Sequence, residues 1–480
     1  QSYDIKISPA GGQSTIDIAK TYDGIIRNIE SISNADVTYN SASRNVVTAG
    51  LDGWRVVQDY ADGDTFDQDL LIEGIPNYLD RVWHGPHSMP DARDAQYAWV
   101  ITWMSVDEYD QKYPGRSKSG IARDYAVSSY WSDTPERIGV GEFYYLKPEK
   151  RTLVKLSDGS VLEKDDSFLS VQDEMAQAGI TVEDERERQK LVLFIREFDD
   201  KGWIDEPVRQ VFENWVPVIP MYGNFKVSNS KIKYRGVVRK PKDAQRVFNY
   251  GKSREIEEGA LAPREKILAT RAMAEGNESS WATLNTNTDP VMFWTPDDDV
   301  PGMAPTKILG PQVNMGLAQT TESMRALITQ QSGKFAASMG DNPGLQSGVA
   351  IDALQDKAAV ADNKFILCRE IAQEQTARIL VNAIPKIYTP GRQVRLLKED
   401  KTFDMAVIGQ PVMDQQTGQM VVLNDLSQGT YDVNCSSGPS FKNRQNETVK
   451  SMTEIGAIDP TVMEIGSDVL LSNISAPGMD

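Results

Sequence analysis

Apolar residues recur at helical spacing over two neighbouring stretches in the middle of the chain. The longer stretch, Val349 to Ile384, contains neither Gly nor Pro, and it predicts one helix that is ~54 Å long at a rise of ~1.5 Å per residue. A shorter pattern opens with Pro311, which suits the first turn of a helix, and runs to about Phe335. The loop between them, 337–348, is rich in Gly, Pro and Ser. A helix of this length usually supports a large structure.

A further helix is expected upstream, from Pro241 to about Ala260, with Pro263 just beyond its end. From Ala262 to Gly310 the periodicity is weak and Gly and Pro recur. The middle of the chain is therefore predicted to run helix, compact irregular module, helix, loop and long helix.

The regions on both sides of this arrangement alternate apolar and polar residues, as strands do. The candidate strands are 53–60, 97–104, 137–146, 190–196, 215–222, 394–397, 405–408, 420–423 and 430–434. A hairpin is expected at Asp158-Gly159, between 152 and 162. Ser14 is expected to cap an N-terminal helix, and Ser105 with Glu108 forms a capping box. The fold class is therefore α+β.

Charge and cysteine content narrow the possible functions. Sixty-nine acidic against 51 basic residues give a formal charge of −18, which disfavours stable binding of DNA through its phosphates but permits loose passage of DNA through a hole.

Cys368 and Cys435 are the only cysteines, and we expect buried free thiols in a reducing compartment. No apolar run is long enough to cross a membrane, so we expect a soluble protein.

The irregular module carries an unusual charge pattern. Between Ala272 and Thr306 the chain has six acidic residues and no Lys or Arg. The acidic residues are Glu275, Glu278, Asp289, Asp297, Asp298 and Asp299, and the aromatic residues among them are Trp281, Phe293 and Trp294. This pattern fits a solvated acidic loop above tucked-in aromatics, and it equally fits a docking surface for a basic partner. A metal site at 297–299 is disfavoured, because adjacent carboxylates point in different directions.

The segment around the central loop is polar and close to neutral. Its candidate contact residues are Gln330, Gln331, Lys334, Ser338, Met339, Asp341, Asn342 and Gln346. A simple connector is one interpretation; a surface along which nucleic acid slides is the other, because few fixed charges make few electrostatic traps. The loop lacks the Gly-Lys-Ser/Thr ending of a phosphate-binding loop, so no nucleotide cofactor is expected.

Candidate catalytic chemistry is sparse. His84 and His87 are the only histidines, and neither lies in a hydrolase or zinc motif. The alternative of a metal-dependent nuclease or hydrolase would rest on scattered carboxylates such as Asp91 and the distant 399–401. We therefore predict no catalytic residue, no metal and no cofactor.

Several short segments resemble the P22-like portal proteins of short-tailed, podovirus-type bacteriophages. The matching segments are Gly53–Tyr60, Val216–Gly223, Tyr234–Arg239, Val422–Asp425 and Gly438–Phe441. They occur in the order of that family, and the similarity extends from about Gly50 to Gly456.

The resemblance implies a ring, usually of twelve subunits, at one vertex of a capsid, through which double-stranded DNA enters and later leaves. The regions it implies are a wing (1–240), stem helix 1 (241–261), a small α/β clip (262–310), stem helix 2 (311–336), a tunnel loop (337–348), a long helix (349–385), wing strands (386–440) and the helical start of a crown (441–480). Little of the family's upstream wing helices or of its downstream crown is visible in the chain.

The resemblance also implies partners and a location. The clip would bind the terminase large subunit and later the tail adaptor, whereas the ring would contact the major capsid and scaffolding proteins. Assembly would take place in the host cytoplasm, and the product would lie at the portal vertex of the virion. A different ring component of the head-to-tail junction remains an alternative.

Overall fold

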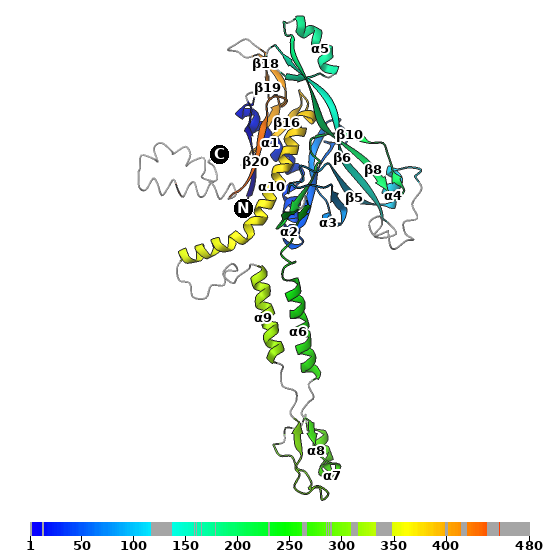
Figure 1. Ribbon diagram of the computed structural model, residues 1–480, viewed down its shortest axis with the longest axis vertical. Helices are drawn as coiled ribbons and strands as arrows, with labels where there is room; N and C mark the ends of the chain where they lie inside the picture. Colours follow the sequence, from blue (N-terminus) through cyan, green and yellow to red (C-terminus); the bar gives the residue numbers. More distant parts are fainter. Residues whose placement is uncertain are drawn as a thin grey trace. The chain divides into compact units, whose positions relative to one another are not determined.

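The computed structural model describes residues 2–11, 14–116, 137–157, 159, 161–164, 166–177, 179–228, 231–261, 266–284, 286, 288, 290–308, 315–332, 348–398, 402–413, 420–438 and 451. Contacts divide the chain into two compact units, Gln1–Gly236 with Asp362–Asp480, and Val237–Ala361. Sheets and helices make up the first unit, and helices dominate the second (Figure 1). The expected α+β class is confirmed.

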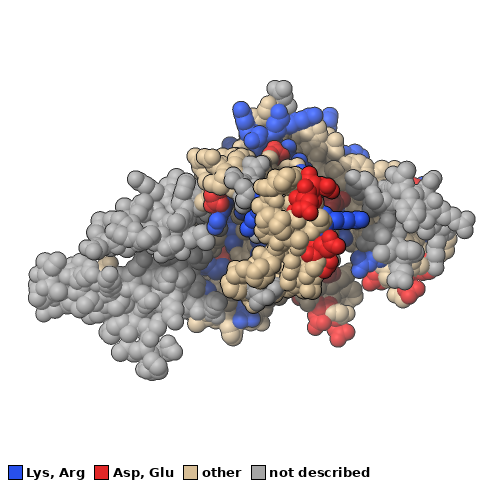
Figure 2. Space-filling model, turned by 90° about the horizontal axis from the view of Figure 1, so that it is seen from below, with Lys and Arg blue, Asp and Glu red and all other residues tan. Residues whose placement is uncertain are grey.

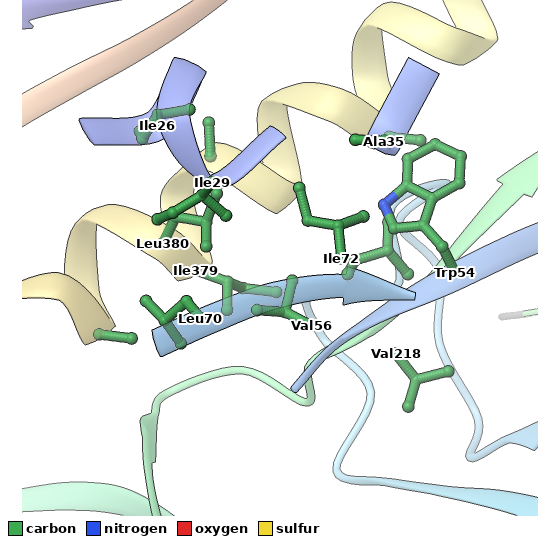
Figure 3. Packing of buried hydrophobic residues seen from close by; sticks show 14 of the residues in the cluster. Ile26, Ile29, Ala35, Trp54, Val56, Leu70, Ile72, Val218, Ile379 and Leu380 are labelled. Carbon is green, nitrogen blue, oxygen red and sulfur yellow. The ribbon is translucent and has the colours of Figure 1, made fainter. Parts of the chain in front are cut away.

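A three-stranded antiparallel sheet lies at the centre of the first unit. Its order is β11 (Val218–Tyr222), β2 (Leu51–Tyr60) and β3 (Gln68–Gly74). Its core also includes side chains from α1 (Ile16–Ile32), α2 (Ala35–Thr48) and α10 (Gly348–Ile387). Figure 3 shows Val56 and Leu70 of the sheet near Ile379 of α10. The apolar face of the long helix therefore helps to make this core.

Trp54 connects the sheet to the long helix. Its side chain is fully buried, and its indole N–H donates a 2.8 Å hydrogen bond to Thr376 Oγ1 of α10. The ring also meets Tyr39 of α2 edge-on, with 4.8 Å between ring centroids. A buried indole N–H needs such a partner, because an unsatisfied buried donor is costly.

A larger antiparallel sheet has the strand order β10-β8-β6-β5-β4, with β7 on β6 and β9 on β8. The bounds are β4 (Val82–His84), β5 (Tyr97–Ser105), β6 (Arg137–Leu156), β7 (Val161–Glu163), β8 (Val182–Asp199), β9 (Gly202–Trp203) and β10 (Val208–Glu213). The pairing of β7 with β6 confirms the hairpin expected there, although Asp158 lies outside the described residues. Short helices accompany this sheet: α3 (Tyr78–Arg81), α4 (Val106–Lys112) and α5 (Asp166–Gln177).

β6 and β8 are both much longer than the sequence indicated. The outer half of β8 is almost entirely polar, with no alternation of apolar residues, whereas the outer half of β6 still buries Val154 and Leu156. Cross-strand ion pairs join the two strands, such as Lys155 with Glu183 at 2.7 Å. Backbone hydrogen bonds and cross-strand ion pairs stabilise such a polar strand, which hydrophobic periodicity does not predict.

Two strands of the first unit that lie far apart along the chain pair with each other. β1 (Ser2–Pro9) and β20 (Tyr431–Gly438) form an antiparallel two-stranded sheet. Carboxylates accept backbone N–H groups of both strands: Asp23 accepts from Ile7, and Glu370 of α10 accepts from Ser437. Three further hairpins are β12 (Lys226–Ser228) with β13 (Lys231–Lys233), β16 (Gln393–Leu397) with β17 (Phe403–Val407), and β18 (Gln410–Met413) with β19 (Met420–Leu423).

The helix boundaries agree only in part with those predicted from local sequence signals. The capping box of Ser105 and Glu108 is present at the start of α4. The predicted cap at Ser14 was wrong, because Thr15 caps α1 whereas the Ser14 hydroxyl bonds the Gly11 backbone. The long helix continues beyond its predicted end to Ile387, with Pro385 inside its last turns. The helix expected near Lys442 lies outside the described residues.

The second unit contains α6 (Lys242–Leu261), α9 (Met315–Ser332) and a small module between them. The module consists of β14 (Lys266–Leu268), α7 (Arg271–Ala274), α8 (Glu278–Ala282) and β15 (Thr306–Ile308). The predicted order of helix, module, helix and long helix is confirmed at the level of these elements.

Both cysteines are buried and free. Burial raises the pKa of the Cys368 thiol to about 11 and that of Cys435 to about 12, so both remain thiols near neutral pH. None of the helices in the described part of the chain has the length and low polarity needed to cross a bilayer.

We predict that Thr376→Val lowers the free energy of unfolding by ~1–3 kcal/mol, because it leaves the buried Trp54 N–H without its acceptor at nearly constant side-chain volume. Denaturant titration monitored by tryptophan fluorescence measures the change. Thr320→Val is the matched control, since that hydroxyl is exposed on α9 and donates to the Gly316 carbonyl. Equal stability of both variants would contradict the prediction.

Candidate functional site

Two helices of the second unit, α6 and α9, lie side by side (Figure 1). Gly251 of α6 permits a close approach, since a Cβ at that position would lie 2.3 Å from Thr321 Oγ1 of α9. Thr321 is almost completely buried, and its hydroxyl donates to the Leu317 carbonyl one turn earlier in its own helix. Because Gly251 has no side chain, α6 and α9 can pack closely together where it faces Thr321.

The charges on the helix pair neutralise one another along each helix. α6 has four basic and four acidic residues. Arg246 pairs with Asp243 at 3.6 Å, and Arg254 pairs with Glu257 at 2.7 Å. The 18 residues of α9 include a single acid and a single base, Glu322 and Arg325, and these pair too. Both helices therefore have no net charge.

α6 and α9 also carry exposed apolar side chains, which the sequence patterns did not mark as a contact surface. They are Val247, Tyr250, Ile256 and Met315. A helix that already packs against a neighbour and still exposes large apolar groups has surface suited to a second contact. The spacing of Val247 and Tyr250, three residues apart on one helix face, was the available signal.

The module between the helices has a small interior of its own. Met273 is buried at its centre, and the indole N–H of Trp281 donates to the Phe293 carbonyl at 3.1 Å. The Thr295 hydroxyl donates to the Glu275 carbonyl at 2.9 Å. These bonds hold the long 290–308 segment against the two short helices.

The aromatic residues predicted for the module differ in exposure. Trp281 is half-buried, whereas Phe293 and Trp294 are exposed. Figure 2 shows acidic side chains gathered beside a broad uncharged surface. The structure thus gives Trp281 an internal packing role and leaves Phe293 and Trp294 accessible to a partner.

The acidic residues of the module also divide into two groups. Asp297 is half-buried, and its carboxylate accepts hydrogen bonds from the Thr270 hydroxyl and from the Asp299 backbone N–H. Glu275, Glu278, Asp298 and Asp299 are exposed, and Asp289 lies outside the described residues. Asp297 therefore stabilises a turn, and its neighbours display their charge to solvent.

The candidate contact residues of the central loop are only partly described. Gln330 and Gln331 lie in the last turn of α9, where Gln330 is exposed. Lys334, Ser338, Met339, Asp341, Asn342 and Gln346 lie outside the described residues.

The residues that were candidates for catalysis form hydrogen bonds or ion pairs with other side chains of the first unit. His84 Nε2 pairs with the Tyr78 hydroxyl at 2.7 Å, and burial lowers the pKa of His84 to about 3. His87 Nε2 pairs with the Tyr222 hydroxyl at 2.8 Å. Asp91 is buried 3.7 Å from Arg378 and 3.6 Å from Arg93.

Within the described ranges, no group of three or more His, Cys, Asp or Glu side chains is arranged to hold a metal ion. Residues 399–401, the other half of the nuclease alternative, lie outside those ranges.

Comparisons with known proteins find similarity to phage portal proteins along the whole chain. A family model described as phage P22-like portal protein matches residues 1–480. The portal protein of Acyrthosiphon pisum secondary endosymbiont phage 1 is 24% identical over 500 residues, which cover 99% of this chain and 68% of that protein.

Proposed function

The chain belongs to the phage P22-like portal protein family, and from this membership we propose that its copies form a ring at the unique capsid vertex through which double-stranded DNA is packaged and ejected. Portal proteins are structural components of the phage, and the role proposed here involves no catalysis and no cofactor. The proposed ring has twelve subunits and lies in the virion after assembly in the host cytoplasm.

The observation that supports a channel most directly is the helix pair α6 and α9 with a separate module between them. Two helices that pack together through Gly251 and Thr321, and still expose apolar side chains, suit repetition around a ring. We assign α6 and α9 to the stem, 262–310 to the clip, 337–348 to the tunnel loop and α10 to the long helix behind it. The wing would comprise 1–240 and 386–440, with the crown starting at 441.

The electrostatics of the helix pair suit DNA that must move. A duplex is retained by each phosphate that a lysine or arginine neutralises, because counterions are then released. On α6 and α9 the basic groups Arg246, Arg254 and Arg325 already have acidic partners. With a chain charge of −18, a ring would conduct a duplex without gripping it. Gln330 and Gln331 would then face DNA as neutral polar groups, together with the tunnel-loop residues.

The module supplies the docking surface in this proposal. Phe293 and Trp294 offer exposed aromatic contact area, and Asp298 and Asp299 beside them attract a basic partner. We propose that the terminase large subunit docks here during packaging and the tail adaptor afterwards. The capsid and scaffolding proteins would contact the wing.

We predict that electron micrographs of the purified full chain show rings with a central opening and a narrow stem. A heterologous contact that closes on itself gives such a particle. Compact particles without an opening, or monomers alone in light scattering under every assembly condition, would contradict the proposed function.

We predict that assembled rings bind linear duplex DNA only weakly at ~0.15 M salt, because the helix pair has no net charge and most of its basic side chains are already in ion pairs. A salt titration followed by fluorescence anisotropy measures this, with a basic DNA-binding protein as positive control. Tight binding that persists as salt rises would count against the proposal.

We predict that Asp298→Asn with Asp299→Asn slows association of terminase or adaptor at low salt by about tenfold, and that the effect shrinks as salt rises. Phe293→Ala should instead speed dissociation, because it removes buried contact area. Surface plasmon resonance separates the two rates.

The matched control for the charge change is Glu257→Gln with Glu258→Gln, which removes two exposed charges of the same unit outside the module. Identical binding by the module variant and the unchanged protein at low salt would exclude charge steering by this surface.

A further inference from the structure

One face of the seven-stranded sheet in the first unit carries a row of large aromatic side chains. The strand registers place Trp83, Trp99, Phe143 and Arg196 side by side across β4, β5, β6 and β8. Their sequence neighbours Ala98 and Tyr144 point to the opposite face and belong to the hydrophobic core. Trp83, Trp99 and Phe143 therefore lie on the side of the sheet away from that core, where Trp203 of β9 stacks with Trp99. We name this surface, together with Arg196, the aromatic face.

The rings of the aromatic face touch one another and basic groups. Trp99 lies 4.1 Å from Phe143 and 6.5 Å from Trp203 between ring centroids. The Arg196 guanidinium stacks 4.6 Å above the Trp203 ring, and the Lys147 ammonium lies 5.8 Å from the Phe194 ring. The face thus combines polarisable apolar area with positive charge.

The tryptophan side chains of the aromatic face are unusually exposed to solvent, which suits a surface that another molecule covers. Trp83 remains 39% exposed and Trp203 43% exposed, although tryptophan is usually the most favourable side chain to bury. Four of the nine tryptophans of the chain lie on this face: Trp83, Trp99, Trp103 and Trp203. Contiguous exposed aromatic area with basic groups is typical of the centre of a protein interface.

The same chain also has a segment of complementary chemistry, the loop 61–67 between β2 and β3, which we name the acidic loop. Its Phe66 is 97% exposed, the most exposed of the large hydrophobic side chains in the described part of the chain. Asp62, Asp64 and Asp67 lie in the same loop, and all three are exposed. An apolar tip surrounded by carboxylates matches a face of aromatic rings and cations.

The acidic loop has a defined conformation. The Ala61 N–H donates to the Asp67 carbonyl at 2.8 Å and closes the loop. The Arg392 guanidinium holds its base, with bonds of 2.6 Å to the Gln68 carbonyl and 2.7 Å to the Asp69 carboxylate. A loop held in place pays less ordering entropy on binding than a flexible one.

We propose that the acidic loop of one copy docks on the aromatic face of the adjacent copy, with Phe66 against the rings around Trp203 and the aspartates near Arg196 and Lys147. This inference rests on the proposed ring, whose subunit contact it specifies. Two different surfaces of one chain that fit each other make a heterologous contact, which repeats from copy to copy until a ring closes. A second copy is favoured as the occupant because both complementary surfaces belong to this chain.

Two variants of the full chain test the proposal. A loop variant combines Asp64→Asn with Phe66→Ala, and a face variant combines Lys147→Glu with Trp203→Ala. Each alone should need at least about tenfold more protein to assemble, as expected when a central aromatic contact is lost. A matched control, Phe403→Ala with Asp404→Asn, removes another exposed Phe and Asp, here from β17, and should assemble normally.

Mixing the variants gives a stricter test. The loop variant keeps its aromatic face and the face variant keeps its acidic loop, so one intact junction remains and the mixture should stop at 1:1 heterodimers in native mass spectrometry. Rings formed equally well by the unchanged protein and both variants would overturn this proposal and leave the ring intact. Failure of the unchanged protein to form any ring would instead overturn the proposed function.

A photo-crosslinking amino acid in place of Phe66 gives a readout that does not depend on the folding of the face variant. Crosslinks from assembled rings should join this position to peptides containing Trp203 or Trp99 of another copy. Crosslinks that consistently map to a different surface would exclude the proposed junction.

Discussion

The first unit depends on one packing contact, that of the long helix α10 against strands drawn from distant parts of the chain. Thr376 of α10 accepts the Trp54 indole N–H, Glu370 accepts the Ser437 backbone N–H, and Lys386 bonds Glu213 at 2.7 Å. The helix thereby joins β2, β20 and β10, segments separated by hundreds of residues. Because these contacts are largely buried, the helix cannot shift without breaking all of them.

Charge is arranged differently on the parts of this protein. On α6 and α9, acids and bases pair within each helix and leave no net charge. In the module, exposed acids stand beside Phe293 and Trp294. On the large sheet, Arg196 and Lys147 lie over aromatic rings. A neutral surface favours sliding, whereas a charged aromatic one favours docking. The overall charge of −18 conceals these local differences.

Residue types that look alike in the sequence have different tasks in the structure. Asp297 and Asp298 are neighbours, yet the first accepts hydrogen bonds within the module and the second is exposed. Trp281 donates a hydrogen bond inside the module, whereas Trp294 is accessible. His84 and His87 pair with tyrosines in the first unit. In each case the decisive factor is which atoms lie within 3 Å or so, a property that composition does not contain.

The sequence by itself determined the helical order of the middle of the chain, the capping box at Ser105 and the hairpin of β6 with β7, because these depend on neighbours a few residues apart. It missed α2, whose β-branched and polar residues favour a helix only weakly, and the outer half of β8, whose pairing rests on ion pairs. The tertiary structure alone brought β1 to β20, placed Thr376 at Trp54 and assembled the aromatic face from five strands. Such contacts join residues far apart along the chain, and their partners are fixed by packing and hydrogen bonding, which no local periodicity encodes.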